Sequence, residues 1–416
     1  MNKKTDKNNF APRVGLAWDV TGDSRNVVRS GFGISYYPEP HSASNLLGQQ
    51  VPYTISQNYA PETNPLNFAN VPTIANPFPA IVPVKPMSTA ALNAANPRVL
   101  GHDFANTTPY AATWQVSYER QLTQSLMTEI GYVGSIGRNI PIFINPNEVQ
   151  PGTGSNASRR LIQPLNSMNN LIVAVNDNES SYHSLQLKVV KRFAHGLQFL
   201  GSYTFGKSLD YGGSPASGGG AVGNGQTVTR RDLWRGPSGY DVKHRAVLSY
   251  VWDLPWGSGR KWLNNGGPLA AFLGDWQFSG IATFATGRPF TVFLNTGVNN
   301  GAPSWPNRIG PGTLDNPSVD KWFNTADFVA PPPNTYGDSG RGVLYAPGHT
   351  NFDVSLAKRI PIKGSAKVQL RADAFNLFNH PSFGFPNANI GSPTAGKITT
   401  TLNDNRILQL ALKLEF

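Results

Sequence analysis

The sequence predicts an all-β protein, a transmembrane antiparallel β-barrel wall of about eleven strands. Three features support this: many short segments alternate apolar and polar residues, tight turns alternate with long loops, and the alternation continues to the last residue. In the last segment one set of alternate positions is apolar, namely Leu408, Leu410, Leu412, Leu414 and Phe416. A period of two is that of a strand. The opposite face carries Lys413 and Glu415, so one face suits lipid and the other water.

The composition fits a loop-rich β protein. The chain has 416 residues, 39% hydrophobic and 14% charged, with 42 Gly and 34 Pro, which indicates many turns and loops. No apolar run approaches the roughly 20 residues of a membrane-spanning helix. The absence of cysteine excludes disulfides, thiolate metal sites and cysteine nucleophiles.

The net charge of +11 comes from basic residues scattered singly along the chain. That distribution favours solvated lumen and loop charges over a nucleic-acid site. An acidic surface partner such as lipopolysaccharide phosphate is a further option. Residues 1–9 have no apolar stretch of a secretion signal. An outer-membrane protein needs such a signal, so we expect either that the polypeptide starts upstream or that the membrane interpretation is wrong.

In the first half of the chain, alternation predicts strands over 12–20 and 26–37, joined by a short turn at 21–25. A region rich in Pro, Asn and Ala follows, over 38–109. The next pair, 110–121 and 125–135, is joined by the tight turn 122–124, and a polar stretch over 136–181 follows it.

The second half repeats this order. Strands are expected over 182–193 and 197–207, then a Gly/Ser-rich loop over 208–239. Strands 240–254 and 276–286 have a medium connection, and a long loop covers 287–350. The last three strands are expected at 351–360, 367–378 and 405–416.

Short turns and long loops fall at opposite ends, as periplasmic turns and extracellular loops do in bacterial barrels. Two aromatic girdles fit the two membrane interfaces, with Trp18, Trp252, Trp256 and Trp276 at the short-turn ends and Tyr36, Tyr37 and Tyr110 at the long-loop ends. An odd strand number leaves the first strand without its preceding partner, which lipid does not tolerate. We therefore expect the C-terminal half of a larger barrel.

Several phrases resemble those of TonB-dependent outer-membrane receptors of the Oar-like type. They are Asn9-Phe10-Ala11-Pro12-Arg13-Val14-Gly15-Leu16-Ala17-Trp18-Asp19, Val28-Arg29-Ser30-Gly31-Phe32-Gly33-Ile34, Asp241-Val242-Lys243-His244-Arg245 and Gly274-Asp275-Trp276-Gln277-Phe278-Ser279-Gly280. The most specific is Arg371-Ala372-Asp373-Ala374-Phe375-Asn376-Leu377-Phe378-Asn379-His380, which resembles the penultimate strand of that family. The chain's last residues resemble the C-terminal assembly signal of outer-membrane barrels.

The resemblance implies a partial receptor barrel domain over 1–416, without signal peptide, plug or other N-terminal domains. It implies a bacterial outer-membrane location and substrate-gated uptake, powered through TonB by way of an N-terminal part absent here. Expected partners are outer-membrane lipid and lipopolysaccharide, the barrel assembly machinery, TonB and an unidentified substrate, with no nucleic acid. No enzymatic activity and no cofactor are expected.

Candidate sites are few. The string Gly218, Gly220, Gly223 favours a flexible loop over a dinucleotide site, because no strand and helix flank it. The seven His residues show no metal-ligand spacing, and the triplet 177–179 favours a solvated loop over a calcium site. No catalytic arrangement is found.

Polar strand residues are the stronger candidates for function. We expect eight to line a lumen, where hydration and plug packing compete with a role in the substrate path: Gln115, Glu119, Lys188, Lys243, Arg245, Gln369, Arg371 and Asp373. Of these, Arg371 and Asp373 share a strand face and are candidates for an ion pair. Loop aromatic residues could gather substrate or simply pack: Tyr53, Tyr59, Trp305, Trp322 and Tyr336.

Two other functions stay open, a surface or adhesion protein that uses the barrel as an anchor, and a passive pore. A soluble carbohydrate-binding β protein is a more distant alternative. The sequence does not choose among iron chelates, cobalamin, saccharides and peptides as substrates.

Overall fold

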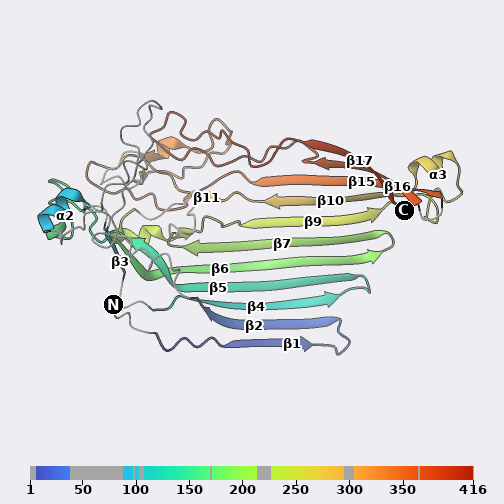
Figure 1. Ribbon diagram of the computed structural model, residues 1–416, viewed down its shortest axis with the longest axis horizontal. Helices are drawn as coiled ribbons and strands as arrows, with labels where there is room; N and C mark the ends of the chain where they lie inside the picture. The colour runs from blue at the N-terminus through green and yellow to red at the C-terminus, as the bar shows by residue number, and fades with distance from the viewer. Residues whose placement is uncertain are drawn as a thin grey trace, which may run out of the picture.

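Most of the chain forms one large antiparallel sheet (Figure 1). The structure is a computed structural model that describes residues 6–37, 88–96, 99–102, 107–168, 171–212, 226–294, 304–363 and 366–415. Eleven strands follow one another along the sheet in chain order, and among the described residues the two edge strands do not pair with each other. The path is β1 (Arg13–Asp19), β2 (Asn26–Tyr36), β4 (Tyr110–Gln121), β5 (Leu126–Ile144), β6 (Leu171–Ala194), β7 (Leu197–Asp210), β9 (His244–Asp253), β10 (Trp276–Ala285), β15 (His349–Lys363), β16 (Ala366–Phe375) and β17 (Ile407–Glu415). The expected strand number is confirmed.

Short connections lie at one end of the sheet and long ones at the other, as Figure 1 shows. One short connection joins β6 to β7 through His195 and Gly196, whose φ angles of 54° and 78° suit a two-residue hairpin turn. At Gly196 an added Cβ would lie 2.9 Å from the Asp253 carbonyl oxygen, so this turn needs glycine. Both edge strands, β1 and β17, run toward this short-turn end.

The strand register gives the sheet one apolar and one polar face. On the apolar face, register partners include Phe32 with Trp114 and Leu370 with Leu412. On the polar face, Glu119 pairs with Glu129, and Glu129 with Lys188. Because antiparallel register partners point to the same side of a sheet, these pairings extend each face across all eleven strands.

The sheet itself has almost no dry core. Many large side chains of the apolar face are exposed, Trp18 by 57% and Leu410 by 84%. Small side chains are among those buried in the central strands, such as Ala282 and Ala357. An apolar surface of this extent is far larger than a soluble monomer normally exposes. Leu412, 73% exposed, is not packed in a protein core.

Both predicted girdles carry aromatic residues on the apolar face. At the short-turn end Trp18 pairs with Val28, and Trp252 with Phe278. At the long-loop end Tyr36 and Tyr110 are register partners with ring centroids 5.7 Å apart.

Three expected boundaries differ most from those of the structure. β5 continues to Ile144 and β6 begins at Leu171, so much of the stretch expected to be loop is strand. The alternation there is obscured by irregular pairing near Gly137 and Ile140, where Asn139 has φ 56°. β9 begins at His244 rather than at residue 240.

Small elements lie outside the main path. At the long-loop end are α2 (Thr89–Ala95), β3 (Val99–His102), β8 (Gly236–Pro237), β11 (Pro289–Phe290), β12 (Asn307–Arg308), β13 (Phe328–Val329), β14 (Leu344–Tyr345) and the 3-10 turns η1 (Gln163–Leu165), η4 (Val228–Trp234) and η5 (Thr325–Asp327). The helix α3 (Pro268–Leu273) belongs to the connection from β9 to β10 and lies at the short-turn end (Figure 1). None of the helices in the described residues has the length and apolarity to cross a membrane.

Candidate functional site

The polar face brings most of the predicted lumen residues onto one surface. By register Gln115, Glu119, Lys188, Arg245, Gln369, Arg371 and Asp373 share it. Lys243 lies just before β9, exposed, and its carbonyl accepts a hydrogen bond of 2.9 Å from the Gly206 amide. Their common face follows from the strand register, and their position in a lumen stays a prediction.

Charges on the polar face are largely neutralised in pairs. Arg29 Nε lies 2.9 Å from Glu119 Oε1 on the neighbouring strand, and Lys188 Nζ lies 3.3 Å from Glu129 Oε2. The guanidinium of Arg371 lies 2.8 Å from Asp373 Oδ1 on the same strand. Most of these side chains are partly exposed, so each pair contributes at most about 1 kcal/mol to stability. Their arrangement gives a polar surface of mixed charge.

A hollow of about 580 Å³ lies along the polar face, across β6, β7, β9, β10, β15 and β16. Its wall includes Arg371 and Asp373 together with Asp353. The Asp353 carboxylate also accepts a 2.9 Å hydrogen bond from the Asn376 amide, which fixes it at the end of β16. The hollow offers hydroxyl, carboxylate and guanidinium groups among apolar side chains such as Phe199 and Ile281.

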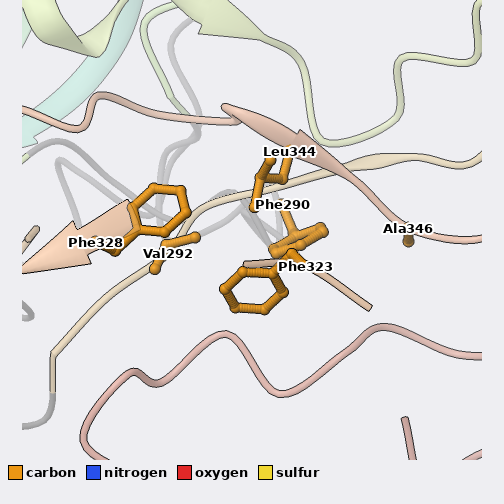
Figure 2. Packing of buried hydrophobic residues seen from close by; sticks show 6 residues of the cluster. All are labelled: Phe290, Val292, Phe323, Phe328, Leu344 and Ala346. Carbon is orange, nitrogen blue, oxygen red and sulfur yellow. The ribbon is translucent and has the colours of Figure 1, made fainter. Parts of the chain in front are cut away.

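At the long-loop end of the sheet, the long connections fold into a small domain that we call the cap. It consists of residues 286–294, 304–348 and 376–406. Six side chains form its core, as Figure 2 shows: Phe290, Val292, Phe323, Phe328, Leu344 and Ala346. Main-chain bonds join its two connections, with Phe293 N 3.0 Å from Ala388 O and Ile398 N 2.7 Å from Val319 O. The long loops therefore present an ordered surface.

A buried arginine connects the cap to the main sheet. The Arg341 side chain is fully buried, pairs with Asp210 at the end of β7, and donates to the Trp234 carbonyl at 2.8 Å and the Gly236 carbonyl at 3.1 Å. Burial lowers the pKa of the Arg341 guanidinium, and the charge of Asp210 opposes that shift. A second contact joins the cap to the β5–β6 connection, since the Tyr336 hydroxyl donates to Val149 O at 2.6 Å.

A polar cleft of about 400 Å³ opens at the long-loop end between β5, β6 and η4. Arg231 pairs with Asp177, and Arg138 Nη1 lies 3.3 Å from Glu179 Oε2. The triplet 177–179 lies in strand β6, so the prediction that it forms a loop was wrong. Both carboxylates have arginine partners, and within the described residues no group of His, Asp and Glu could hold a metal ion.

The loop aromatic residues have distinct positions. Trp305, 2% exposed, packs with Ile142 and Trp234 in a second buried cluster. Trp322 packs on the cap core, and its Nε1 donates to Tyr345 O at 2.8 Å. Packing accounts for both. Tyr53, Tyr59, Gly218, Gly220, Gly223 and Phe416 lie outside the described residues.

A family model for an outer membrane beta barrel domain matches residues 2–409. The chain belongs to this family. Its sheet is the wall of a transmembrane antiparallel β-barrel in the bacterial outer membrane, with the apolar face toward lipid. The long connections are extracellular and the short turns periplasmic.

Solved structures similar to this chain include two transporters and one receptor. They are the outer membrane transporter YddB from Escherichia coli (10% identity, TM-score 0.44, 97% of this chain and 40% of that one), the FrpB iron transporter from Neisseria meningitidis (11%, 0.41, 97% and 39%) and a mutant of the ferric enterobactin receptor PfeA from Pseudomonas aeruginosa (10%, 0.44, 97% and 40%). The chain thus spans about two-fifths of the length of each. No curated protein sequence matches it.

Sequence reasoning missed the cap and the arginine that holds it. The cap core combines residues far apart in sequence, such as Phe290 and Leu344, without any period.

Proposed function

We propose that this chain forms part of the wall and mouth of a TonB-dependent receptor that takes up a polar solute across the outer membrane. The observation that supports this most is the continuous polar face, with its ion pairs and its hollow of about 580 Å³, opposite a lipid-facing surface. A wall that only anchored a surface domain would not need mixed charges along its whole inner side. The lumen residues predicted above would then line the solute path.

We further propose that the wall is completed by additional strands. β1 and β17 are the edges of an antiparallel path of eleven strands, so they run in the same direction. Joining them directly would give a parallel seam, whereas bacterial barrels normally close with an even number of antiparallel strands. An odd number of further strands would give an even total in which every neighbouring pair is antiparallel. This fits the C-terminal part of a larger barrel. The mass of the native outer-membrane protein, measured after detergent extraction, tests this proposal.

Uptake assays test the function directly. Cells with and without the gene are given radiolabelled iron chelates, cobalamin, oligosaccharides and peptides, each also in a strain that lacks TonB. We expect gene-dependent uptake of one class, lost without TonB. Gene-dependent uptake that persists without TonB would indicate a passive pore instead.

The cap favours a second candidate, a surface-binding protein anchored by the barrel. An ordered extracellular domain with its own core offers a binding surface that transport alone does not need. Under this alternative, removal of the cap abolishes adhesion or ligand binding, while no labelled solute enters the cells in a gene-dependent way.

A further inference from the structure

A lysine stands on the lipid-facing side of the wall near its periplasmic end. Lys358 in β15 pairs in register with Trp276 and Leu370, both on the apolar face. It is only 7% exposed. An uncompensated ammonium group at this surface would be costly next to lipid, so its partners explain its position.

Those partners are the end of helix α3. Lys358 Nζ donates to Ala271 O at 2.6 Å, Phe272 O at 3.1 Å and Gly274 O at 2.7 Å. The last carbonyls of a helix have no partner within the helix, and a cation there is favourable. All three donors of the ammonium are used, and the lysine fastens α3 to the outer side of the wall.

Trp276 reinforces the attachment. Trp276 Nε1 donates to Phe272 O at 3.0 Å, and the Lys358 ammonium lies 5.4 Å from the Trp276 ring centroid. Gly274 permits close contact, since an added Cβ would lie 2.4 Å from Ala270 O and 2.7 Å from the Gly257 Cα. The helix therefore has a defined position on the wall.

The side of α3 away from the wall is apolar. Ala270 is buried, whereas Leu269, Phe272 and Leu273 are 59%, 73% and 40% exposed. Trp262 is 49% exposed nearby, with Lys261 Nζ 4.9 Å from its ring centroid. Apolar residues, exposed tryptophan and lysine together are the composition of segments that lie at a membrane surface.

We propose that α3 is a membrane-surface helix that rests in the periplasmic leaflet of the outer membrane, held there by Lys358. The partner that covers the apolar side of α3 is phospholipid. Its acyl chains cover Leu269 and Phe272, and Lys261 faces its phosphate groups. The surface is continuous with the lipid-facing wall, because Lys358 and Trp276 belong to that wall. The helix would fix the depth at which this side of the barrel sits.

The cysteine-free sequence permits a direct measurement of depth. A nitroxide is attached at Phe272→Cys in the full outer-membrane protein, reconstituted in vesicles of phosphatidylethanolamine and phosphatidylglycerol. Collision rates with oxygen and with a water-soluble nickel complex report lipid and water contact. Matched controls are Leu410→Cys on the lipid face and Thr123→Cys in the periplasmic β4–β5 turn.

We expect the oxygen-to-nickel ratio at Phe272→Cys to lie several-fold above that at Thr123→Cys and below that at Leu410→Cys. A ratio equal to that of Thr123→Cys would overturn the membrane-surface position. Because only lipid and this protein are present, another protein cannot produce a lipid-like value.

Lys358→Met in the Phe272→Cys protein tests the fastening. We expect the ratio to fall toward that of Thr123→Cys, while Lys358→Arg keeps it. An unchanged ratio in Lys358→Met would show that the lysine does not hold the helix. If Lys358→Met fails to insert, Lys358→Gln is compared with Lys358→Arg in the same way.

Discussion

At the scale of single residues, burial distinguishes ion pairs that stabilise the fold from ion pairs on the surface. Arg341 is fully enclosed, with Asp210 only 14% exposed beside it, whereas Arg230 and Asp232 form a pair whose side chains are 52% and 62% exposed. Removing one partner of a buried pair leaves an uncompensated charge, while an exposed pair is screened by water. The two arginines therefore have different roles.

Arg341→Met is expected to destabilise the cap by about 3–5 kcal/mol, because Asp210 and two carbonyls lose their partner. The change is measured as faster proteolysis within residues 304–348 on intact cells. Arg230→Met serves as the control, with an expected cost below about 1 kcal/mol. Equal protease resistance in Arg341→Met and the unmodified protein would contradict the assigned role of this arginine.

At the scale of elements, each strand has two faces that must tolerate different substitutions. Leu187 and Gln186 are neighbours near the middle of the β6–β7 pairing, on the apolar and the polar face respectively. Leu187→Lys is expected to cost about 2–4 kcal/mol by placing charge in the bilayer. Gln186→Lys should cost far less. Urea titration of the protein folded in vesicles measures both, and an equal cost would contradict the two-faced strand.

The cap is an element of its own that depends on close backbone contact. At Gly287 an added Cβ would lie 1.6 Å from the Ala346 carbonyl oxygen, so Gly287→Ala should weaken the cap by about 1–3 kcal/mol. At Gly391 the nearest atom, Asn389 Oδ1, is 3.5 Å away, and Gly391→Ala should be tolerated within about 0.5 kcal/mol. Hydrogen exchange of the cap amides compares the two variants. Matching exchange rates would show that this contact is not needed.

At the scale of the whole molecule, the strands that the membrane requires could be predicted from the sequence. The cap and the helix α3, which the membrane does not require, could not. Lipid requires apolar side chains at every second position, so strands such as β4 and β17 are visible as alternation. No such alternation is required in the cap, because its core combines Phe290, Phe323 and Leu344 from separate segments of the connections. The helix α3 has only six residues, too few for a helical period to stand out.

The candidate site likewise has residues that could be predicted from the sequence and residues that could not. Register on one sheet follows from alternation, so the shared face of Gln115, Lys188 and Arg371 could be predicted. Lys358 could not, because its position on the apolar face is compensated by helix carbonyls that only the folded chain brings close. Strand β6 was underestimated for a related reason, since its outer part carries the polar run 176–181.

The whole protein should fractionate as an integral membrane protein. We expect it to pellet with outer membranes, resist extraction by carbonate and high salt, and dissolve in detergent, because its apolar face is exposed on one side of the sheet. Immunoblots of the fractions measure this. Recovery in the soluble periplasm would exclude a barrel wall.

The most direct test of a wall between lipid and water uses two neighbouring residues of β17. Leu412 is 73% exposed and the side chain of Lys413 is 68% exposed, so the protein itself shields neither. In vesicles, a charged thiol reagent should modify Lys413→Cys rapidly and Leu412→Cys very slowly, because only the first faces water. Equal rates, or faster modification of Leu412→Cys, would contradict the account.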